Sequence, residues 1–396
     1  MYASNHDLID ATAERRAIII GGSLGGLFAA TLLRKTGWHV DVYERSPHSL
    51  DARGGGIVLQ PEVVEVLQRT GLALDQTVLG VASAYRTVFR PDGSVQSRNY
   101  SPQIQTSWSL IYNTLRGGLE SRHYHQDKQL VGIESHTSAG RITATFADGE
   151  SASGALLIGA DGGDSTVRRL RWPGIQPAYA GYLAWRGLVP EAAMPDIARQ
   201  ALAGDFAFAH NDGSHMLGYL VPGDGNDMRP GHRLYNWVWY RVADVSLLHD
   251  IMLDADGRQR AFSVPEGKLA TRWAGHLHAD ADRLLPPAFR AIVMATEHPF
   301  AQAIRDLAVE DLVDGRVALL GDAAAIPRPH TAASTSKAAG NALALSDALT
   351  QFPVDVDAAL AAWNPAQAAV GKRLMQHGIQ IGDSLLFGRS PATLIG

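Results

Sequence analysis

Apolar and polar positions at the start of the chain follow the pattern of a strand, a helix and a second strand. Residues 17–20 are all apolar and stop at Gly21, which is typical of a strand buried on both faces of a parallel sheet. Leucine and phenylalanine then recur at helical spacing over residues 24–33, and residues 40–44 form the second strand candidate. This order predicts a βαβ unit of a Rossmann-like fold.

The pattern changes twice further along the chain. Residues 155–158 and 316–320 predict two more buried strands, each followed by glycine. From about residue 179 aromatic-rich strand candidates alternate with Gly, Pro, Asn and Asp turns, and the alanine-rich end predicts helices. We therefore expect an α/β protein with a Rossmann-like, mostly parallel sheet, an inserted antiparallel-sheet domain and C-terminal helices.

The predicted domain boundaries follow these changes of pattern. A flexible tail takes residues 1–14, and C-terminal helices take residues 346–396. The two domains between them are a nucleotide-binding domain (15–80, 101–176 and 286–345) and a substrate domain (81–100 and 177–285).

Composition narrows the classes of function. The chain has 396 residues, 46% of them hydrophobic and 19% charged, so it is expected to be globular. A net charge of -5 argues against nucleic acid as a partner. The absence of cysteine excludes disulfides and thiolate metal sites, so redox chemistry needs a bound cofactor. Acidic residues where a signal peptide would be basic, and apolar runs far shorter than about 20 residues, predict a cytoplasmic protein with no membrane partner.

Residues 21–26 read Gly-Gly-Ser-Leu-Gly-Gly and connect the first strand to the first helix. This is the position of the G-x-G-x-x-G fingerprint, in which backbone N–H groups at a helix N-terminus bind a pyrophosphate. Ser23 replaces the middle glycine, and Glu44 ends the second strand where a ribose-binding carboxylate is expected. A glycine-rich turn without a ligand is the alternative. The predicted cofactor contacts here are Gly21, Ser23, Leu24, Gly25, Gly26 and Glu44.

Two later motifs occur in a characteristic order with this fingerprint. Residues 159–162 read Gly-Ala-Asp-Gly, and residues 321–324 read Gly-Asp-Ala-Ala, followed by Pro329. Together they resemble the group A flavoprotein aromatic hydroxylases related to para-hydroxybenzoate hydroxylase, over about residues 15–385. Residues 21–23, 56–61, 179–182 with 185–187, and 327–330 look most similar to the 2,6-dihydroxypyridine 3-hydroxylase branch, and urate hydroxylases share part of this pattern.

The resemblance implies FAD as cofactor and NADH or NADPH as co-substrate. It also implies that O₂ is captured as a flavin C4a-hydroperoxide, which hydroxylates an electron-rich aromatic or heteroaromatic ring, here a hydroxylated pyridine. Relatives are commonly homodimers. Three alternatives remain at this point: a urate, phenol or polyketide hydroxylase, a FAD-binding protein without turnover, and a NAD-dependent dehydrogenase with one Rossmann domain.

The resemblance also assigns cofactor contacts outside the fingerprint. Asp322 is expected at the ribityl or pyrophosphate region of FAD, and Asp161 is the second aspartate that contacts FAD. The alternatives are a helix N-cap for Asp322, and a turn or an ion pair with Arg168 for Asp161. Leu130 and Val131 are expected to flank the adenine, with plain strand packing as the alternative. The other expected contacts are Arg45, Gly56, Ile57, Val58, Gly162, Pro329 and Ala332.

The chain departs from the family pattern in two places. Ala332 and Ser334 replace two glycines of the loop that borders the flavin, which predicts an altered loop or a shifted ring. Tyr112 aligns with the arginine that usually opens the mid-domain helix, so pyrophosphate contacts from that helix are not expected.

Hydroxylation of a ring requires a base or an acceptor that activates its hydroxyl group. His330 follows Pro329 in the loop and is the first candidate, with a turn histidine as the alternative. His215, His210 and Tyr219 lie on predicted pocket strands, where exposure of the histidines and core packing of Tyr219 are the alternatives.

Three further expectations concern particular segments. Trp185 and Arg186 alternate on a strand, so at most one points at the pocket. Residues 54–56, all glycine, predict a flexible segment near the flavin, or an ordinary loop. The His-x-His pairs at 123–125 and 276–278 are expected on strands, and without a convincing carboxylate neither is expected to bind metal.

Overall fold

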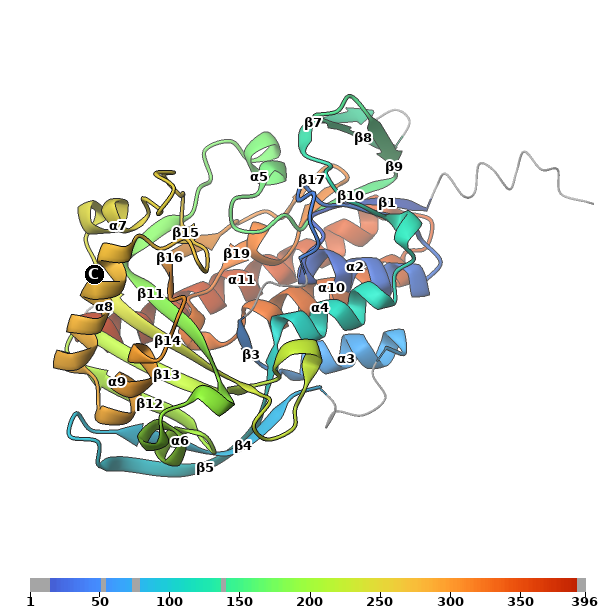
Figure 1. The fold of residues 1–396 in the computed structure, drawn as a ribbon. Coiled ribbons are helices and arrows are strands. Elements are labelled where there is room, and N and C mark those ends of the chain that lie inside the picture. Colours follow the sequence, from blue (N-terminus) through green and yellow to red (C-terminus); the bar gives the residue numbers. More distant parts are fainter. Residues whose placement is uncertain (1–14, 51–54, 73–78, 137–139, 390–396) are drawn as a thin grey trace, which may run out of the picture.

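The computed structural model describes residues 15–50, 55–72, 79–136 and 140–389. The predicted tail, residues 1–14, and Gly54 of the glycine segment lie outside these ranges. The described chain forms a six-stranded, a ten-stranded and a three-stranded sheet (Figure 1). None of its helices is long and apolar enough to cross a bilayer.

The six-stranded sheet is built from the apolar runs that the sequence pattern singles out. Its strands are parallel except for the antiparallel pair of β17 with β18. Every residue of β10 and β18 is buried, which explains why these strands carry no polar face. In spatial order they are β17 (Val313–Asp314), β18 (Val317–Leu319), β10 (Leu156–Gly159), β1 (Arg16–Ile20), β2 (His39–Tyr43) and β6 (Tyr124–His125).

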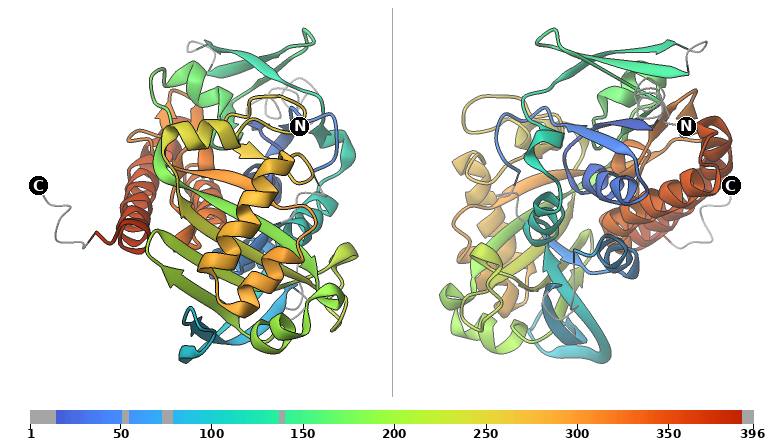
Figure 2. Two further views of the ribbon diagram at one scale, coloured as in Figure 1. Left: turned by 60° about the vertical axis from the view of Figure 1, so that its left-hand side comes forward. Right: turned by 90° about the vertical axis from the view of Figure 1, so that its right-hand side faces the viewer.

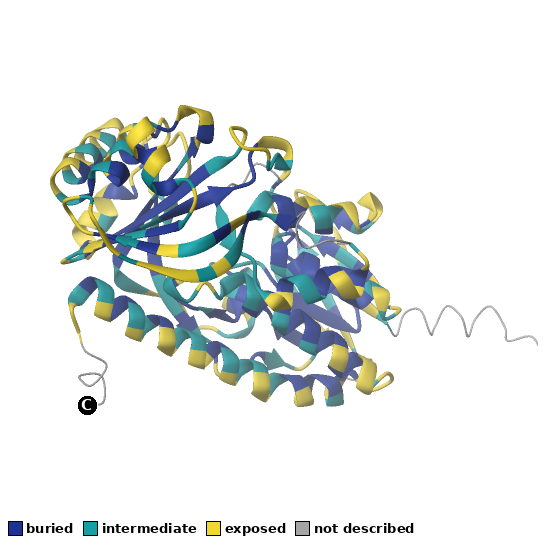
Figure 3. Cartoon of the chain, turned by 90° about the horizontal axis from the view of Figure 1, so that it is seen from below, coloured by how far each residue is buried: buried dark blue, intermediate teal, exposed yellow. Residues whose placement is uncertain are grey.

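The helices packed on and beside this sheet include the longest ones in the described chain. Helix α10 packs against α2, α3 and α11, and α2 also packs against α4. Figure 3 shows one side of α11 buried against the protein and the other exposed. These helices are α2 (Leu24–Lys35), α3 (Pro61–Thr70), α4 (Trp108–Gly117), α5 (Thr166–Arg171), α10 (Ser334–Gln351) and α11 (Val356–Phe387).

The ten-stranded sheet is antiparallel except where β12 pairs with β4. Beyond β16, it follows the order β11, β14, β13, β12, β4, β5 and β3. Its strands are β3 (Gly56–Val58), β4 (Val81–Phe89), β5 (Val95–Ser107), β11 (Ala178–Pro190), β12 (Phe206–Asn211), β13 (Ser214–Val221), β14 (Leu234–Val242), β15 (Ser263–Val264), β16 (Phe300–Ala308) and β19 (Ala325–Ile326).

One face of this large sheet carries its own helical layer. Helices α8 and α9 lie across it (Figure 2), and with α6 they enclose a core that includes Trp185 and Trp237. The opposite face turns toward the first sheet and α11. The helices of this layer are α6 (Asp196–Leu202), α7 (Val245–Ile251), α8 (Thr271–Leu284) and α9 (Pro287–Met294).

The remaining elements are short. The three-stranded sheet contains β7 (Leu130–His136), β8 (Arg141–Phe146) and β9 (Ser151–Gly154). Single 3₁₀ turns are η2 (Ser121–His123), η4 (Glu191–Ala193), η5 (Asp224–Asn226), η6 (Gly321–Ala323) and η7 (Pro329–Thr331).

The predicted fold class is confirmed: a mostly parallel sheet, a second antiparallel sheet and C-terminal helices are all present. The expected strand at residues 276–278 is wrong, because these residues lie within α8. The domain boundaries stay a prediction, although β16 lies in the large sheet and not in the nucleotide-binding sheet to which the division assigned it.

Candidate functional site

Two adjoining cavities meet at Ser23, Trp108 and Asp322. The first, which we call the sheet cavity, has a volume of about 470 Å³ and is bounded by β3, β11, β13 and β16. The second, the turn cavity, has a volume of about 380 Å³ and is bounded by the glycine turn, Glu44 and Asp161. They share lining residues and so form one continuous groove: Ser23, Trp108, Gly163, Phe262, Asp322, Ser334 and Thr335.

The glycine turn of the turn cavity cannot accept side chains at two positions. Gly21 has a φ of 107°, and a Cβ there would lie 2.4 Å from the carbonyl oxygen of Ala160. A Cβ on Gly26 would lie 1.9 Å from the carbonyl oxygen of Gly21. The turn therefore holds strand and helix in the close contact that the fingerprint requires.

Ser23, the departure from the fingerprint, is the N-cap of α2 and lines both cavities. Its side chain makes no capping hydrogen bond, so its hydroxyl can donate to a ligand. Leu24 and Gly25, in the first turn of α2, line the turn cavity, where the helix N-terminus favours an anion.

Glu44 is buried at the far end of the turn cavity. One carboxylate oxygen accepts the N–H of Gly22 at 2.8 Å and the other accepts the N–H of Ser46 at 2.9 Å. Each oxygen keeps a second lone pair, so the carboxylate can still accept hydroxyl groups of a ribose.

Arg45 and Leu130 line the turn cavity beside Glu44. Val131 does not: its side chain points away on β7 and is 49% exposed. The expectation that Val131 flanks a bound adenine is therefore not supported, because this residue, at the irregular register between Leu130 and Gly132, is open to solvent and does not line the cavity.

Asp161 and Gly162 line the same cavity, but the Asp161 carboxylate also caps α5. It accepts the hydroxyl of Ser165 at 2.5 Å and the N–H of Thr166 at 2.6 Å. Burial raises its pKa, and these hydrogen bonds oppose that effect. No ion pair with Arg168 forms among the described contacts; the Arg168 guanidinium instead donates to the carbonyl oxygens of Gly163 and Ala323.

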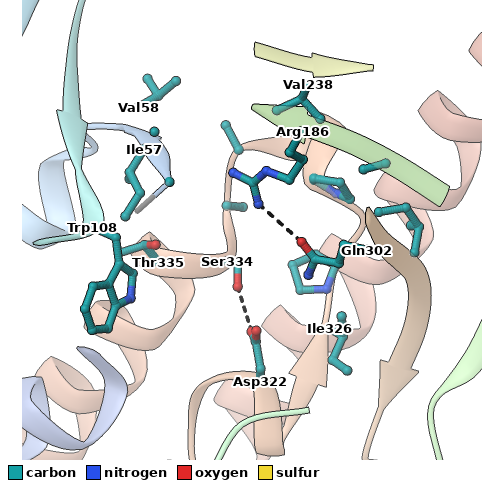
Figure 4. A pocket seen from close by; sticks show the side chains of 18 of the residues that line it. Ile57, Val58, Trp108, Arg186, Val238, Gln302, Asp322, Ile326, Ser334 and Thr335 are labelled. Carbon is teal, nitrogen blue, oxygen red and sulfur yellow. Dashed lines mark hydrogen bonds between the residues drawn. The ribbon is translucent and has the colours of Figure 1, made fainter. Parts of the chain in front are cut away.

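Asp322 lies where the two cavities meet (Figure 4). One carboxylate oxygen accepts the hydroxyl of Ser334 at 2.6 Å and lies 3.0 Å from Nζ of Lys337. Burial lowers the pKa of Lys337, and the charge of Asp322 opposes that shift. Sequence reasoning missed Lys337; its only signal was a lone lysine in an alanine-rich helix.

The loop after Pro329 keeps a glycine-like conformation without glycine. The backbone of Ala332 is left-handed, with φ 52° and ψ 21°. Pro329 and Ala332 both line the sheet cavity. A non-glycine residue in this region costs about 1–2 kcal/mol, so packing must hold the loop there. The backbone thus retains the turn expected of the missing glycine.

Backbone and aromatic groups shape the rest of the sheet cavity. Gly56, Ile57 and Val58 of β3 line one wall, and a Cβ on Gly56 would lie 2.5 Å from the ring of Tyr219. Trp108 lines both cavities and stacks on Tyr112, which aligns with the absent arginine, at a centroid distance of 4.7 Å.

The three candidate histidines lie beside the sheet cavity and do not line it. His330 Nε2 lies 2.9 Å from the hydroxyl of Tyr182, and the ring centroids of His330 and His215 are 5.5 Å apart. His210 is exposed and stacks on His215. Tyr219 is the one catalytic candidate that lines the cavity, and burial raises its pKa to about 12.

Burial lowers the pKa of both His215 and His330 to about 3, and the charge of Arg328 adds to the effect at His330. Unfolding releases these histidines to a pKa of about 6.5, so the unfolded chain binds more protons between these values. We expect stability to fall as pH drops from about 6.5 toward 3, by up to about 1.4 kcal/mol per pH unit for each histidine.

Urea unfolding of wild type and His215→Phe across this pH range measures that contribution. The variant is expected to show the shallower pH dependence, whereas His249→Phe at an exposed position should match the wild type. Parallel curves for wild type and His215→Phe would contradict the assignment.

His123 and His125 face a carboxylate that the sequence did not reveal. Their ring nitrogens lie 3.0 and 3.4 Å from Oδ1 of Asp41, and these hydrogen bonds help to lower the pKa of Asp41 against the effect of burial. Within the described residues, no group of three or more His, Cys, Asp or Glu side chains is suited to a metal ion.

Comparisons with known proteins decide the family. A model described as FAD binding domain matches residues 14–240, and one described as FAD binding domain-like matches residues 179–306. The chain is 35% identical over 376 residues to 2,6-dihydroxypyridine 3-monooxygenase of Paenarthrobacter nicotinovorans, covering 95% of this chain and 92% of that one. The chain belongs to the group A flavin monooxygenases.

Structural similarity agrees with this family. The structure of 2,6-dihydroxypyridine-3-hydroxylase from Arthrobacter nicotinovorans aligns with a TM-score of 0.88 at 32% identity, covering 96% of this chain and 95% of that one. The chain is also 26% identical over 348 residues to 6-hydroxynicotinate 3-monooxygenase of Pseudomonas fluorescens, covering 82% and 79% of the two chains. The predicted class of enzyme, a FAD-dependent monooxygenase using NADH or NADPH, is confirmed.

The groove of this flavin monooxygenase fits FAD. The glycine turn, the uncommitted hydroxyl of Ser23 and the remaining lone pairs of Glu44 suit a pyrophosphate and a ribose at one end. The continuous sheet cavity, lined by Gly56 and Ala332, has room for a ring system at the other.

Proposed function

We propose that the enzyme hydroxylates a hydroxylated pyridine or a similar small heteroaromatic ring. The observation that carries this proposal is a sheet cavity walled by Tyr219, Arg186 and Gln302, polar groups that match a small ring bearing hydroxyl groups. The similarity to 2,6-dihydroxypyridine 3-monooxygenase and 6-hydroxynicotinate 3-monooxygenase supports it. Urate, phenol and polyketide rings are the competing substrates.

FAD held in this groove and reduced by NADH or NADPH would activate O₂, from which the transferred oxygen atom would come. Gly21, Ser23, Leu24, Gly25, Glu44 and Asp322 would hold its nucleotide end, and Gly56 and Ala332 would border its ring. The chain's own task is to hold the substrate against that ring and to exclude water. Tyr219 would orient a substrate hydroxyl, because its own hydroxyl stays protonated at neutral pH.

His330 and His215 are proposed to act behind the cavity and not as direct bases. With a pKa of about 3 each remains neutral at neutral pH, so neither retains a substrate proton well. His330 would instead fix Tyr182 through the contact with its hydroxyl. Cytoplasmic location and a homodimer stay predictions, as does the absence of nucleic-acid and membrane partners.

A substrate panel tests the proposed function. Hydroxypyridines, urate and phenols are each added to the FAD-loaded enzyme in air, with NAD(P)H consumption and product mass as readouts. We expect a hydroxypyridine to stimulate consumption and to gain one oxygen atom. If only urate or phenols stimulated NAD(P)H consumption, the proposed substrate class would be wrong. If no ring stimulated it, a FAD-binding protein without turnover would be favoured.

Asp322→Ala is expected to lower FAD affinity by about 10- to 100-fold, because it removes the carboxylate at the junction of the cavities and leaves Lys337 buried without its partner. Flavin absorbance retained after gel filtration measures the effect. Asp347→Ala, which removes an exposed carboxylate paired with Arg69, should keep full flavin content. Full flavin content in Asp322→Ala would contradict the assignment.

A further inference from the structure

Arg186 projects from β11 into the sheet cavity (Figure 4). Strand alternation sends the neighbouring Trp185 into the core beneath α8 and α9, so Arg186 is the member of this pair that faces the site. Its guanidinium donates to the side-chain oxygen of Gln302 at 3.2 Å, and its Nε is buried without a partner.

The charge of Arg186 is not balanced by a carboxylate among the described residues. The cavity's other charged groups are paired: Arg305 lies 2.6 Å from Asp164, and Asp322 lies 3.0 Å from Lys337. The guanidinium carbon of Arg186 lies 5.6 Å from the centroid of the Phe300 ring, and this cation–π contact offsets only part of the cost of a part-buried cation without a counter-ion. A ligand of opposite charge would offset the rest.

The groups around Arg186 are donors as well. Asn236 uses its side-chain oxygen to accept the N–H of Gly56, and its Nδ2 is buried without a partner. Tyr219 and Tyr240 are the titratable side chains facing Arg186 from β13 and β14; burial raises the pKa of both, and the charge of Arg186 partly opposes this. Of these groups, Arg186 and Tyr219 line the cavity and offer positive charge and an O–H donor, whereas Asn236 and Tyr240 do not line it.

We propose that Arg186 binds the substrate as an anion, pairing with a deprotonated ring hydroxyl. Binding by Arg186 lowers the pKa of the bound hydroxyl, and the proton leaves to bulk water as the anion binds. The anion is the electron-rich form that hydroxylation requires, so this residue supplies the activation without a side-chain base. The proposal rests on the proposed function for the identity of the ring.

Binding of two matched ligands to the FAD-loaded enzyme tests this role. The probes are 2,6-dihydroxypyridine, which can form an anion, and 2,6-dimethoxypyridine, which cannot. Affinities come from changes in the flavin spectrum, and calorimetry in two buffers of different ionisation enthalpy counts the protons released. We expect Arg186→Met to weaken binding of the dihydroxypyridine by about 10- to 100-fold and to abolish proton release.

Three comparisons separate a charge effect from damage to the site. Arg186→Met should weaken binding of the dimethoxypyridine by less than about twofold. Arg186→Lys should recover part of the affinity for the dihydroxypyridine, and Arg290→Met, at an exposed position, should match the wild type. The proposal would be overturned if Arg186→Met weakened binding of both ligands equally, or if Arg186→Lys recovered none of the loss. It would also be overturned if the wild type bound the dihydroxypyridine without releasing a proton at a pH below the pKa of its free hydroxyl. Failure of the wild type to bind the dihydroxypyridine would likewise overturn it.

Hydroxylation rates recorded in parallel distinguish the proposed function from the proposed role of Arg186. Arg186-dependent binding without hydroxylation of any pyridine would contradict only the proposed function. Hydroxylation of the dihydroxypyridine that is unchanged in Arg186→Met would contradict only the role of Arg186.

Discussion

Gly26→Ala is expected to abolish stable FAD binding and to lower the free energy of unfolding by about 3 kcal/mol or more. The added Cβ would lie 1.9 Å from the carbonyl oxygen of Gly21, a backbone atom that cannot rotate away. Relief requires α2 to move away from β1, which would take the helix N-terminus and Ser23 away from the pyrophosphate position. Flavin absorbance after gel filtration and urea unfolding of the apoprotein measure the two effects.

Gly275→Ala is the matched control. Gly275 lies within α8, and a Cβ there meets no atom within 4 Å. Because glycine is the poorer helix former, this substitution should stabilise the protein by about 0.5–1 kcal/mol and leave FAD content unchanged. A Gly26→Ala protein with wild-type flavin content and urea midpoint would show that the turn is not closely packed in solution.

Local patterns in the sequence predicted those parts of the fold that short segments determine. The buried run before Gly21, the glycine turn and the strand ending at Glu44 are contiguous, so their spacing alone predicted the βαβ unit. The failure at residues 276–278 has a related cause. His276 and His278 alternate with an apolar residue, but two histidines are too few to separate a strand from the helix that the longer segment forms.

The site was harder to predict because its groups meet across long separations. The pairing of Gly56 with Asn236 joins residues 180 positions apart, and no local pattern reports it. Alternation indicated that at most one of Trp185 and Arg186 faces the cavity, but which one depends on the face of β11 that the helices α8 and α9 cover. The pairing of Asp322 with Lys337 likewise depends on how η6 meets the first turns of α10.

The same long-range assembly places a buried ion-pair network behind the cavity. Arg328 is 5% exposed in its side chain and forms two parallel contacts with Asp306 of β16, at 2.9 and 2.8 Å. It also donates to Asp383 of α11 at 2.7 Å. Burial alone would lower the pKa of Arg328, but the neighbouring carboxylates raise it above its usual value. One side chain thus joins the loop before His330 to the large sheet and to the long C-terminal helix.

Arg328→Met should destabilise the protein by about 3–5 kcal/mol, because it removes the arginine that pairs with part-buried Asp306 and leaves buried Asp383 with only the exposed Arg389 at 3.7 Å. Urea unfolding of the apoprotein at neutral pH measures the loss.

Arg69→Met provides the comparison for that loss. Arg69 also contacts two carboxylates, those of Asp347 and Glu65, both at 2.6 Å, but its side chain is 41% exposed. Water can solvate these carboxylates when the arginine is removed, so the expected cost is below about 1 kcal/mol. Equal losses in the two variants would mean that water reaches Asp306 and Asp383, and the network would then not fix the loop that carries His330.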